Sequence, residues 1–359
     1  METFKRLEMI DFWRGLALVI IFINHIPLNF LSRFTPSNFN FSDCAEALVF
    51  ISGVSCTLAY KRIFSSYNFL RASLPIIRRI AVLYASHITI TVIGLMLIIS
   101  AYLLTSNSNL LSNHDWLEVM IADPAELIFS VITFRQQFAY FDILPLYIFL
   151  LMLSPALLLL GLFNRHVMLV FSFALYLAAR NHILSLPLNG SFFNPLAWQF
   201  MYAIGIYVGL TLKDTGLRYN RLLYGFCFAF TVWSTTVVTN MAGFWPSLWQ
   251  DLGDYMDLSK TDLGTTRIID FLTLGYVIYH TRCFNAVRNL PFFNSIARLG
   301  RNALAVFCVG TLLSIIGQIV TELGQNNFIE DIVFVMAGVA LLHLVAGIFE
   351  QRNQLLRKS

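Results

Sequence analysis

The chain has 359 residues, of which 57% are hydrophobic and only 12% are charged, and its mean hydropathy is +0.69. Soluble globular proteins are about half apolar and about a quarter charged, so this composition excludes a soluble domain. Apolar runs of about twenty residues without alternation exclude a β-barrel and predict a helical, polytopic membrane protein. The net charge of +4 is small, and we expect no nucleic-acid partner.

Ten hydrophobic segments follow one another along the chain, and an even number of spans places both termini on one side of the membrane. With the termini in the cytoplasm, 18 of the 24 basic residues fall on the cytoplasmic side, as the positive-inside rule requires. We therefore predict an all-α protein with about ten transmembrane helices, both termini cytoplasmic, in a single integral-membrane domain over residues 1–359. The segments are 12–30, 43–61, 76–104, 141–163, 166–184, 194–212, 221–241, 267–282, 301–321 and 328–349.

The first segment carries polar side chains that lipid disfavours, at a cost of about 2.5–3.5 kcal/mol for each charge at its centre. Arg14 and His25 are eleven residues apart, so a helix places both on one face, about 16 Å apart along its axis. Asp11 lies one turn before Arg14, Asn24 is adjacent to His25, and Pro27 predicts the end of the helix. Snorkelling of Arg14 and a packing contact of His25 are the alternatives to a functional site.

The second segment begins with two acids one turn apart, Asp43 and Glu46. A carboxylate beside His25 would fix its tautomer, as a general base requires, and the choice between the two acids is open. Asp43 is also a candidate helix N-cap. The small residues that follow, including Gly53 and Ser55, are expected to pack against the first segment.

Two later segments begin with polar residues on the same side of the membrane as His25. Asp142 begins the fourth segment, and Asn194, Trp198 and Gln199 begin the sixth. These side chains predict a sugar site built from hydrogen bonds and aromatic stacking. A helix cap is the alternative for Asn194, which precedes a proline.

Other motifs point to no further chemistry. The histidines and cysteines lack metal-ligand spacing, so we predict no metal, and there is no P-loop, GxGxxG or GxSxG motif. The predicted inner loops are rich in arginine, as topology requires. Some of these arginines are candidates to hold the phosphates of a cytoplasmic donor such as coenzyme A.

Seven blocks of this sequence together have a familiar pattern: Asp-Phe-Trp-Arg-Gly-Leu-Ala (11–17), Phe-Ile-Asn-His-Ile-Pro (22–27), 35–47, Phe-Ile-Ser-Gly (50–53), 141–147, 194–199 and 300–307. These blocks resemble the OpgC family of bacterial inner-membrane proteins, which are implicated in succinylating osmoregulated periplasmic glucans. The Arg14–His25 spacing is similar to the arginine–histidine motif of the related acyltransferase-3 proteins.

The resemblance implies a multi-pass protein of the bacterial inner membrane that transfers an acyl group, expected to be succinyl, to a glucan or other glycan. It implies acyl-CoA as co-substrate, with no permanently bound cofactor, and membrane lipid and the glycan as the other partners. His25 is then expected to be the general base or a transient acyl carrier, with Asp43 or Glu46 orienting it and Arg14 holding the donor. A transporter or flippase of an acyl donor or lipid-linked sugar is the alternative.

Overall fold

The computed structural model describes residues 2–27, 29–106, 123–135, 137, 139–186, 192–214, 216–239, 256–281, 283–324 and 328–358. Within these ranges the chain is helical and contains no β-strand. The longer helices are α1 (Glu2–Asn24), α2 (Cys44–Ser66), α3 (Phe69–Thr105), α7 (Ile143–Phe163), α8 (Arg165–Arg180), α9 (Pro195–Asp214), α10 (Arg221–Thr239), α12 (Thr265–His280), α15 (Ala303–Leu323) and α16 (Phe328–Lys358).

Shorter helices connect these elements. They are α6 (Pro124–Ile132), α13 (Cys283–Arg288) and α14 (Phe293–Arg301), with the 3₁₀ turns η1 (Phe30–Phe34), η2 (Pro36–Asn38) and η3 (Ala139–Phe141).

Each of the ten predicted segments overlaps one of the ten longer helices, although α1 begins ten residues before the predicted start and ends six residues before the predicted end. Seven of the ten are long and apolar enough to cross a membrane, so the protein is a helical membrane protein. Of the other three, α8 and α12 have 16 residues each, and α1 carries Glu8, Asp11 and Arg14. Ten spans and cytoplasmic termini therefore remain predictions.

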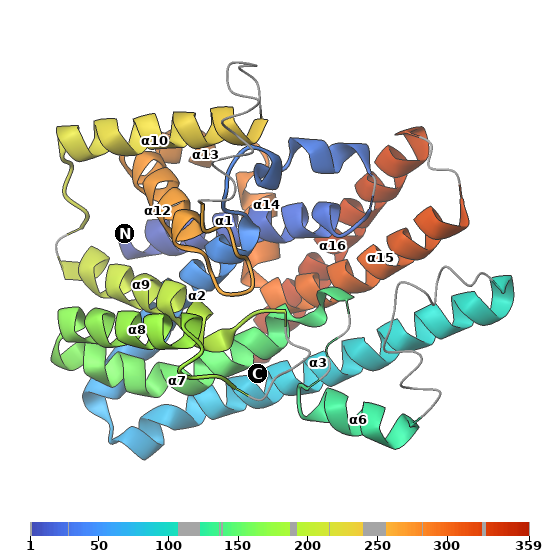
Figure 1. Cartoon of the computed structure of the whole chain (residues 1–359), viewed down its shortest axis with the longest axis horizontal. Helices are drawn as coiled ribbons and strands as arrows, with labels where there is room; N and C mark the ends of the chain where they lie inside the picture. The colour runs from blue at the N-terminus through green and yellow to red at the C-terminus, as the bar shows by residue number, and fades with distance from the viewer. Residues whose placement is uncertain are drawn as a thin grey trace.

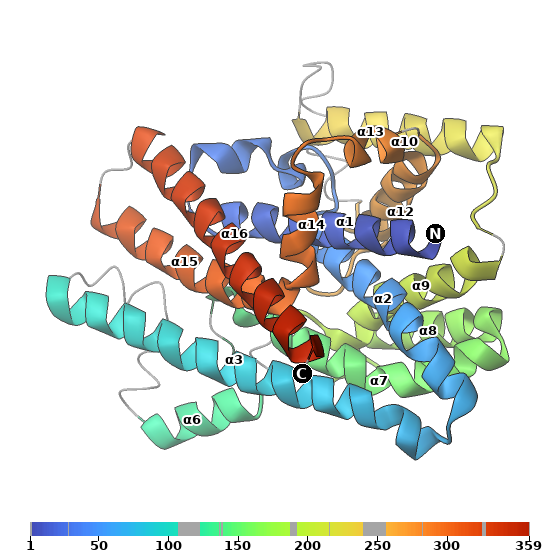
Figure 2. The ribbon, with the colours of Figure 1, turned by 180° about the vertical axis from the view of Figure 1, so that it is seen from behind.

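One continuous apolar core joins the first and last helices, from Ala17 on α1 to Ala346 on α16. The 37-residue helix α3 runs along one edge of the molecule in both views, with α6 beside its C-terminal half (Figures 1 and 2). The N-terminal half of the chain packs against α9, α14 and α15, which follow much later in sequence. Elements distant in sequence therefore meet around α1 and α2.

Two pairs of helices cross with their backbones in contact. A Cβ atom at Gly300 on α14 would lie 1.8 Å from the carbonyl oxygen of Asp11, and one at Gly15 would lie 2.1 Å from that of Ile296. Similarly, a Cβ atom at Gly53 on α2 would lie 2.1 Å from the carbonyl oxygen of Tyr202 on α9. The prediction that Gly53 packs against the first segment is therefore wrong, because its open face receives the backbone of α9.

Helix α1 ends at Asn24, as predicted from Pro27. The side-chain amide of Asn29 donates to the carbonyl oxygens of Ile23 and Ile26, at 2.7 Å each. Carbonyl groups at a helix end have no intrahelical partner, and Asn29 satisfies two of them. This turn fixes the direction in which the chain leaves α1, directly after His25.

Candidate active site

A network of charged side chains surrounds the start of α2. Asp43 is the N-cap of α2, and its Oδ1 accepts the Ala45 N–H at 2.7 Å. Glu46 completes a capping box by accepting the Asp43 N–H at 2.9 Å. The capping expected for Asp43 is therefore confirmed, and it leaves the other carboxylate oxygens of both acids for other partners.

Two basic side chains from much later in the sequence form ion pairs with these carboxylate oxygens. Arg267, on the first turn of α12, lies 2.6 Å from Glu46 Oε1 through Nη2, and its Nε donates to the same oxygen at 2.7 Å. The same Nη2 lies 3.3 Å from Asp43 Oδ2, and the Lys260 Nζ lies 2.6 Å from that oxygen. Glu46 is fully buried and Arg267 is 8% exposed, so a paired charge is required at each.

A third acid on α12 extends the network. Asp270 is fully buried, and its Oδ2 accepts the Ser42 N–H at 2.9 Å and the Ser42 hydroxyl at 2.7 Å. These bonds tie α12 to the residue directly before the Asp43 cap. The start of α2 is therefore fixed by contacts from both the 260 region and α12.

His25 lies directly after the last residue of α1. Its ring stacks on Tyr140, with centroids 3.8 Å apart and an interplanar angle of 11°, and its carbonyl oxygen accepts from Gln318 Nε2 at 3.0 Å. Its Nδ1 is buried, and no described residue hydrogen-bonds it. The ring therefore packs face to face on Tyr140, and its Nδ1 is left for a ligand or for water.

The structure does not join the predicted carboxylates directly to His25. Asp43 and Glu46 bind Arg267 and Lys260 instead, and neither forms a hydrogen bond or ion pair with the imidazole. A formal positive charge stabilises a buried carboxylate more than a neutral imidazole does, which explains why the two acids pair with Arg267 and Lys260. The orientation of His25 by Asp43 or Glu46 therefore stays a prediction, and the contacts of the two acids in this structure are with Arg267 and Lys260.

Arg14 forms a second polar centre about three turns back along α1. Its Nη1 donates to Asp11 Oδ1 at 3.2 Å and to the Gly300 carbonyl oxygen at 3.4 Å, and its Nη2 donates to Ser55 Oγ. The predicted Asp11–Arg14 stripe is therefore present. Ser55 contacts the first helix as expected, while Gly300 comes from α14.

The three predicted sugar-binding residues of α9 have protein partners in this structure. Gln199 is fully buried, accepts the Ser172 hydroxyl at 2.6 Å and donates to the Ser172 carbonyl oxygen at 2.7 Å. Trp198 is also fully buried, and its indole N–H donates to the Lys260 carbonyl oxygen at 3.0 Å. Asn194 donates through Nδ2 to Asp262 Oδ1 at 2.9 Å and caps α9 through Leu196 N. Asn194 and Trp198 therefore hold the 260 region and Gln199 holds α8, and a sugar contact of these three residues stays a prediction.

Two further predicted binding residues are close to His25 or to its stacking partner in sequence. Asn24 directly precedes His25, and Asp142 follows Tyr140 by two positions. Asn24 has a buried Oδ1 that no described residue hydrogen-bonds, while its Nδ2 lies 3.5 Å from Ser37 Oγ. Asp142 precedes α7 and makes no side-chain cap. Both side chains retain hydrogen-bonding capacity for a ligand.

Sequence reasoning missed three residues of the site: Lys260, Arg267 and Tyr140. One signal was available for two of them. Lys260 and Arg267 are basic residues on the predicted outer side, where basic residues are rare, and Asp270 follows within an apolar segment. Tyr140 carried no such signal, because an aromatic residue near a helix start is ordinary in membrane proteins.

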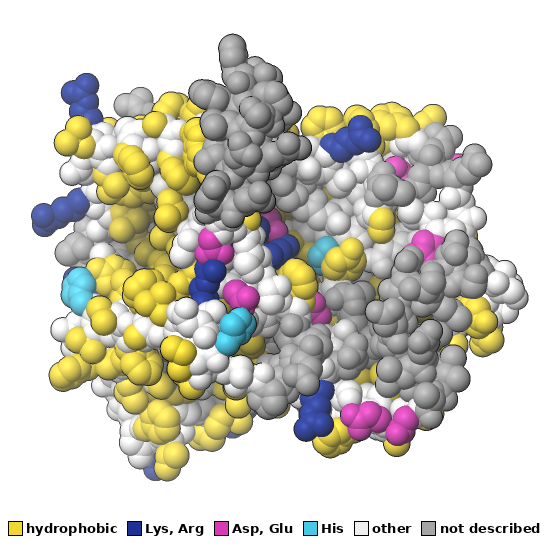
Figure 3. Space-filling view, in the orientation of Figure 1, with side chains coloured by type: hydrophobic (Ala, Val, Ile, Leu, Met, Phe, Trp, Pro, Cys, Tyr) yellow, Lys and Arg dark blue, Asp and Glu magenta, His cyan; other side chains and the backbone are white. Residues whose placement is uncertain are grey.

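Charged and histidine side chains come to the surface near the middle of one face, beside a larger apolar area on the left of the view (Figure 3). A small hollow of about 10 Å³ lies between α1 and α15 and is lined by His25, Thr311 and Ser314 among apolar residues. It has room for about one water molecule.

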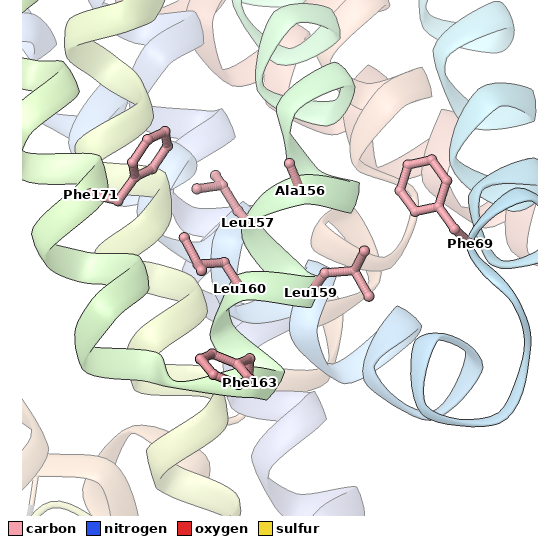
Figure 4. Close-up of a pocket in the computed structure, with 7 residues that line it drawn as sticks. All are labelled: Phe69, Ala156, Leu157, Leu159, Leu160, Phe163 and Phe171. Carbon is pink, nitrogen blue, oxygen red and sulfur yellow. The ribbon is translucent and has the colours of Figure 1, made fainter.

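A groove of about 520 Å³ between α3, α7 and α8 is lined only by apolar residues, from Phe69 to Phe171 (Figure 4), so it offers no groups for chemistry. In the part of the chain that the structure describes, no group of His, Cys, Asp and Glu is placed to hold a metal.

Apolar membrane-crossing helices that enclose a histidine and a buried ion-pair network define a helical membrane protein with a polar interior site. The profile of the OpgC protein family matches residues 5–354, almost the entire chain. The chain therefore belongs to the OpgC family. No curated protein and no solved structure matches it.

Proposed function

We propose that this protein transfers an acyl group, succinyl in the first instance, from acyl-CoA on the cytoplasmic side of the inner membrane to a hydroxyl of a periplasmic glucan. Membership in the OpgC family supports an acyltransferase-type membrane enzyme. The observation that carries the proposal is the state of His25. Its ring is stacked on Tyr140 and its backbone is bound by Gln318, while its Nδ1 is left without a bond from any described residue.

In this reaction His25 is the general base. It accepts the proton of the glucan hydroxyl while the hydroxyl oxygen forms a bond to the thioester carbonyl carbon. The tetrahedral intermediate then collapses, the carbon–sulfur bond breaks, and the proton returns from His25 to the departing thiolate. The products are the glucan ester and free coenzyme A, so the reaction needs no further reactant.

Arg14 would act on the donor. Its guanidinium is fixed by Asp11, Ser55 and the Gly300 carbonyl oxygen, on the face of α1 that also presents His25. Residues eleven apart on a helix are separated by about 16 Å along its axis. An extended donor that enters from the cytoplasm would pass Arg14 before its thioester reaches His25. Asn24 and Asp142 are the side chains proposed to contact the acceptor.

The test is release of coenzyme A thiol by the purified protein in lipid nanodiscs with succinyl-CoA and periplasmic glucan. His25→Ala is expected to lower the release at least 100-fold, because general bases contribute about 10²–10⁴-fold. His166→Ala is the matched control, since His166 lies on the first turn of α8 and contacts Tyr207 rather than the site. The control should retain wild-type release.

Two results would contradict the proposal. Near-normal release by His25→Ala in a folded protein would remove His25 from the role of base. Absence of thiol release from the wild-type protein, together with movement of donor or glycan across the membrane of sealed proteoliposomes, would favour a transporter. Mass spectrometry of the glucan identifies the group transferred and so tests succinyl against other acyl groups.

A further inference from the structure

We propose that one ordered water molecule binds in the small hollow between α1 and α15 and fixes the tautomer of His25. Thr311 and Ser314 are then positioning residues, which act on the imidazole through this water. All three residues line the hollow, and its volume of about 10 Å³ suits a single water molecule. This inference rests on the acyl-transfer reaction proposed above, because it assigns the ring nitrogen that acts as base in that reaction.

Helix α15 contacts the end of α1 through one polar face. Thr311, Ser314 and Gln318 are three and four residues apart, so a helix places them on the same side. The Gln318 Nε2 donates to the His25 carbonyl oxygen at 3.0 Å, and the Ser314 hydroxyl lies 3.4 Å from the carbonyl oxygen of Phe22. These contacts, together with the shared hollow, join His25 to the two hydroxyl groups of α15.

The hydroxyl groups of Thr311 and Ser314 already use their hydrogen atoms. Thr311 donates to the Phe307 carbonyl oxygen at 2.9 Å, and Ser314 donates to that of Gly310 at 3.0 Å. A hydroxyl has one hydrogen and two acceptor lone pairs, so each group can only accept a further hydrogen bond. A water molecule in the hollow must therefore donate its two hydrogens to these two oxygens.

This arrangement determines which nitrogen of His25 carries the hydrogen. A water molecule that donates both hydrogens has only lone pairs left, so it must accept a hydrogen bond from the imidazole. Nδ1 is the ring nitrogen that is buried without a hydrogen bond from any described residue, and we assign it to the water. Nδ1 therefore carries the hydrogen, and a buried polar group that would be costly without a partner gains one.

The other ring nitrogen of His25 is left for the reaction. No described residue hydrogen-bonds Nε2 either, and only Nδ1 of the two is buried, so Nε2 stays open to the acceptor. With its hydrogen on Nδ1, a neutral imidazole presents a lone pair at Nε2, as a general base requires. Nε2 accepts the proton of the glucan hydroxyl and later returns it to the departing thiolate. The water keeps both of its hydrogens throughout, so the proton balance of the reaction is unchanged.

Nitrogen-15 NMR of the imidazole tests the tautomer without any turnover. In protein labelled at histidine and held in nanodiscs, the chemical shifts distinguish a protonated ring nitrogen from an unprotonated one, and His25→Ala identifies the His25 signals. At a pH where the ring is neutral, wild-type His25 should carry its hydrogen on Nδ1. In Thr311→Val/Ser314→Ala, which removes both acceptors of the water, this form should no longer dominate.

Thiol release from succinyl-CoA with glucan is the second measurement. Thr311→Val/Ser314→Ala should lower kcat about 10-fold to 100-fold, as loss of the outer partner of a functional imidazole does, with both KM values within about twofold. Thr311→Ser keeps a hydroxyl group at this position and should restore kcat close to wild type. The matched control is Thr231→Val/Ser234→Ala on α10, where the same residue types three apart donate to helix carbonyl oxygens at 2.9 and 3.0 Å. The control should keep wild-type kcat.

The outcomes distinguish this inference from the proposed reaction. Wild-type kcat in the folded Thr311→Val/Ser314→Ala variant, or a hydrogen on Nε2 in wild-type His25, would overturn the water site alone. If the double variant does not fold, the tautomer of the wild-type ring decides. A hydrogen on Nδ1 in a wild-type protein that releases no thiol would support the water site and overturn the acyl-transfer reaction.

Discussion

At the scale of single residues, Asp43 and Glu46 have two kinds of partner: neighbours in sequence that they cap, and a distant arginine that balances their charge. Asp43 and Glu46 form a capping box with one another, as residues three apart at a helix start do. Their charges are balanced by Arg267, which is 221 positions after Glu46 in the chain. The N-cap role follows from local sequence, whereas the choice of cation depends on how α12 packs against α2.

The Arg267–Glu46 pair predicts a large stability effect. Arg267→Met leaves the fully buried Glu46 without its cation, so the free energy of unfolding should fall by about 3–5 kcal/mol. Arg298→Met is the matched control, because Glu350 keeps Arg301 at 2.7 Å and these arginine side chains are exposed. Its effect should stay within about 1 kcal/mol. Denaturant unfolding in detergent measures both, and equal effects would contradict a special role for the buried pair.

At the scale of elements, helix α14 connects the Arg14 centre to the C-terminal part of the chain. Its Gly300 lies against the Asp11 backbone and presents its carbonyl oxygen to Arg14 at 3.4 Å. Small residues allow such close approach of helix backbones in membranes. The position of Arg14 therefore depends on the α1–α14 crossing as well as on α1.

Gly300→Ala should separate these helices, because the new Cβ atom would lie 1.8 Å from the Asp11 carbonyl oxygen. We expect a loss of about 1–3 kcal/mol or more in unfolding free energy, and a fall in thiol release as Arg14 shifts. Gly225→Ala on α10 is the control, since no atom lies within 4 Å of its added Cβ. The control should be neutral or up to about 1 kcal/mol more stable. Thermal unfolding with parallel activity assays distinguishes the two, and an unaffected Gly300→Ala would contradict the crossing.

At the scale of the whole molecule, the number of spans decides which side of the membrane each loop faces. Helix α8 has 16 residues, a length of about 24 Å against a hydrocarbon core of about 30 Å. If α8 crosses, Ser185 lies on the side opposite to Ser66, as the ten-span topology predicts. If α8 does not cross, the two lie on the same side.

Cysteine labelling tests this topology in intact cells whose outer membrane has been made permeable. In a variant without the five natural cysteines, Ser185→Cys should react with a membrane-impermeant maleimide. Ser66→Cys should react only after the inner membrane is opened. Both positions are exposed in the structure, so labelling reports sidedness rather than burial. Labelling of both positions from the same side would contradict ten spans.

The sequence by itself determined the helical membrane class, the positions of the ten long helices, and the stripe from Asp11 and Arg14 to His25. These features depend on hydrophobicity and on the helical repeat, which act over a few turns of chain. Only the tertiary structure decided that Arg267 and Lys260 neutralise the acids of α2, that Gly53 meets α9, and that Trp198 binds the backbone of Lys260 and Thr261. Such contacts join residues far apart in sequence, and burial of charge and close packing select them only when the whole bundle has assembled.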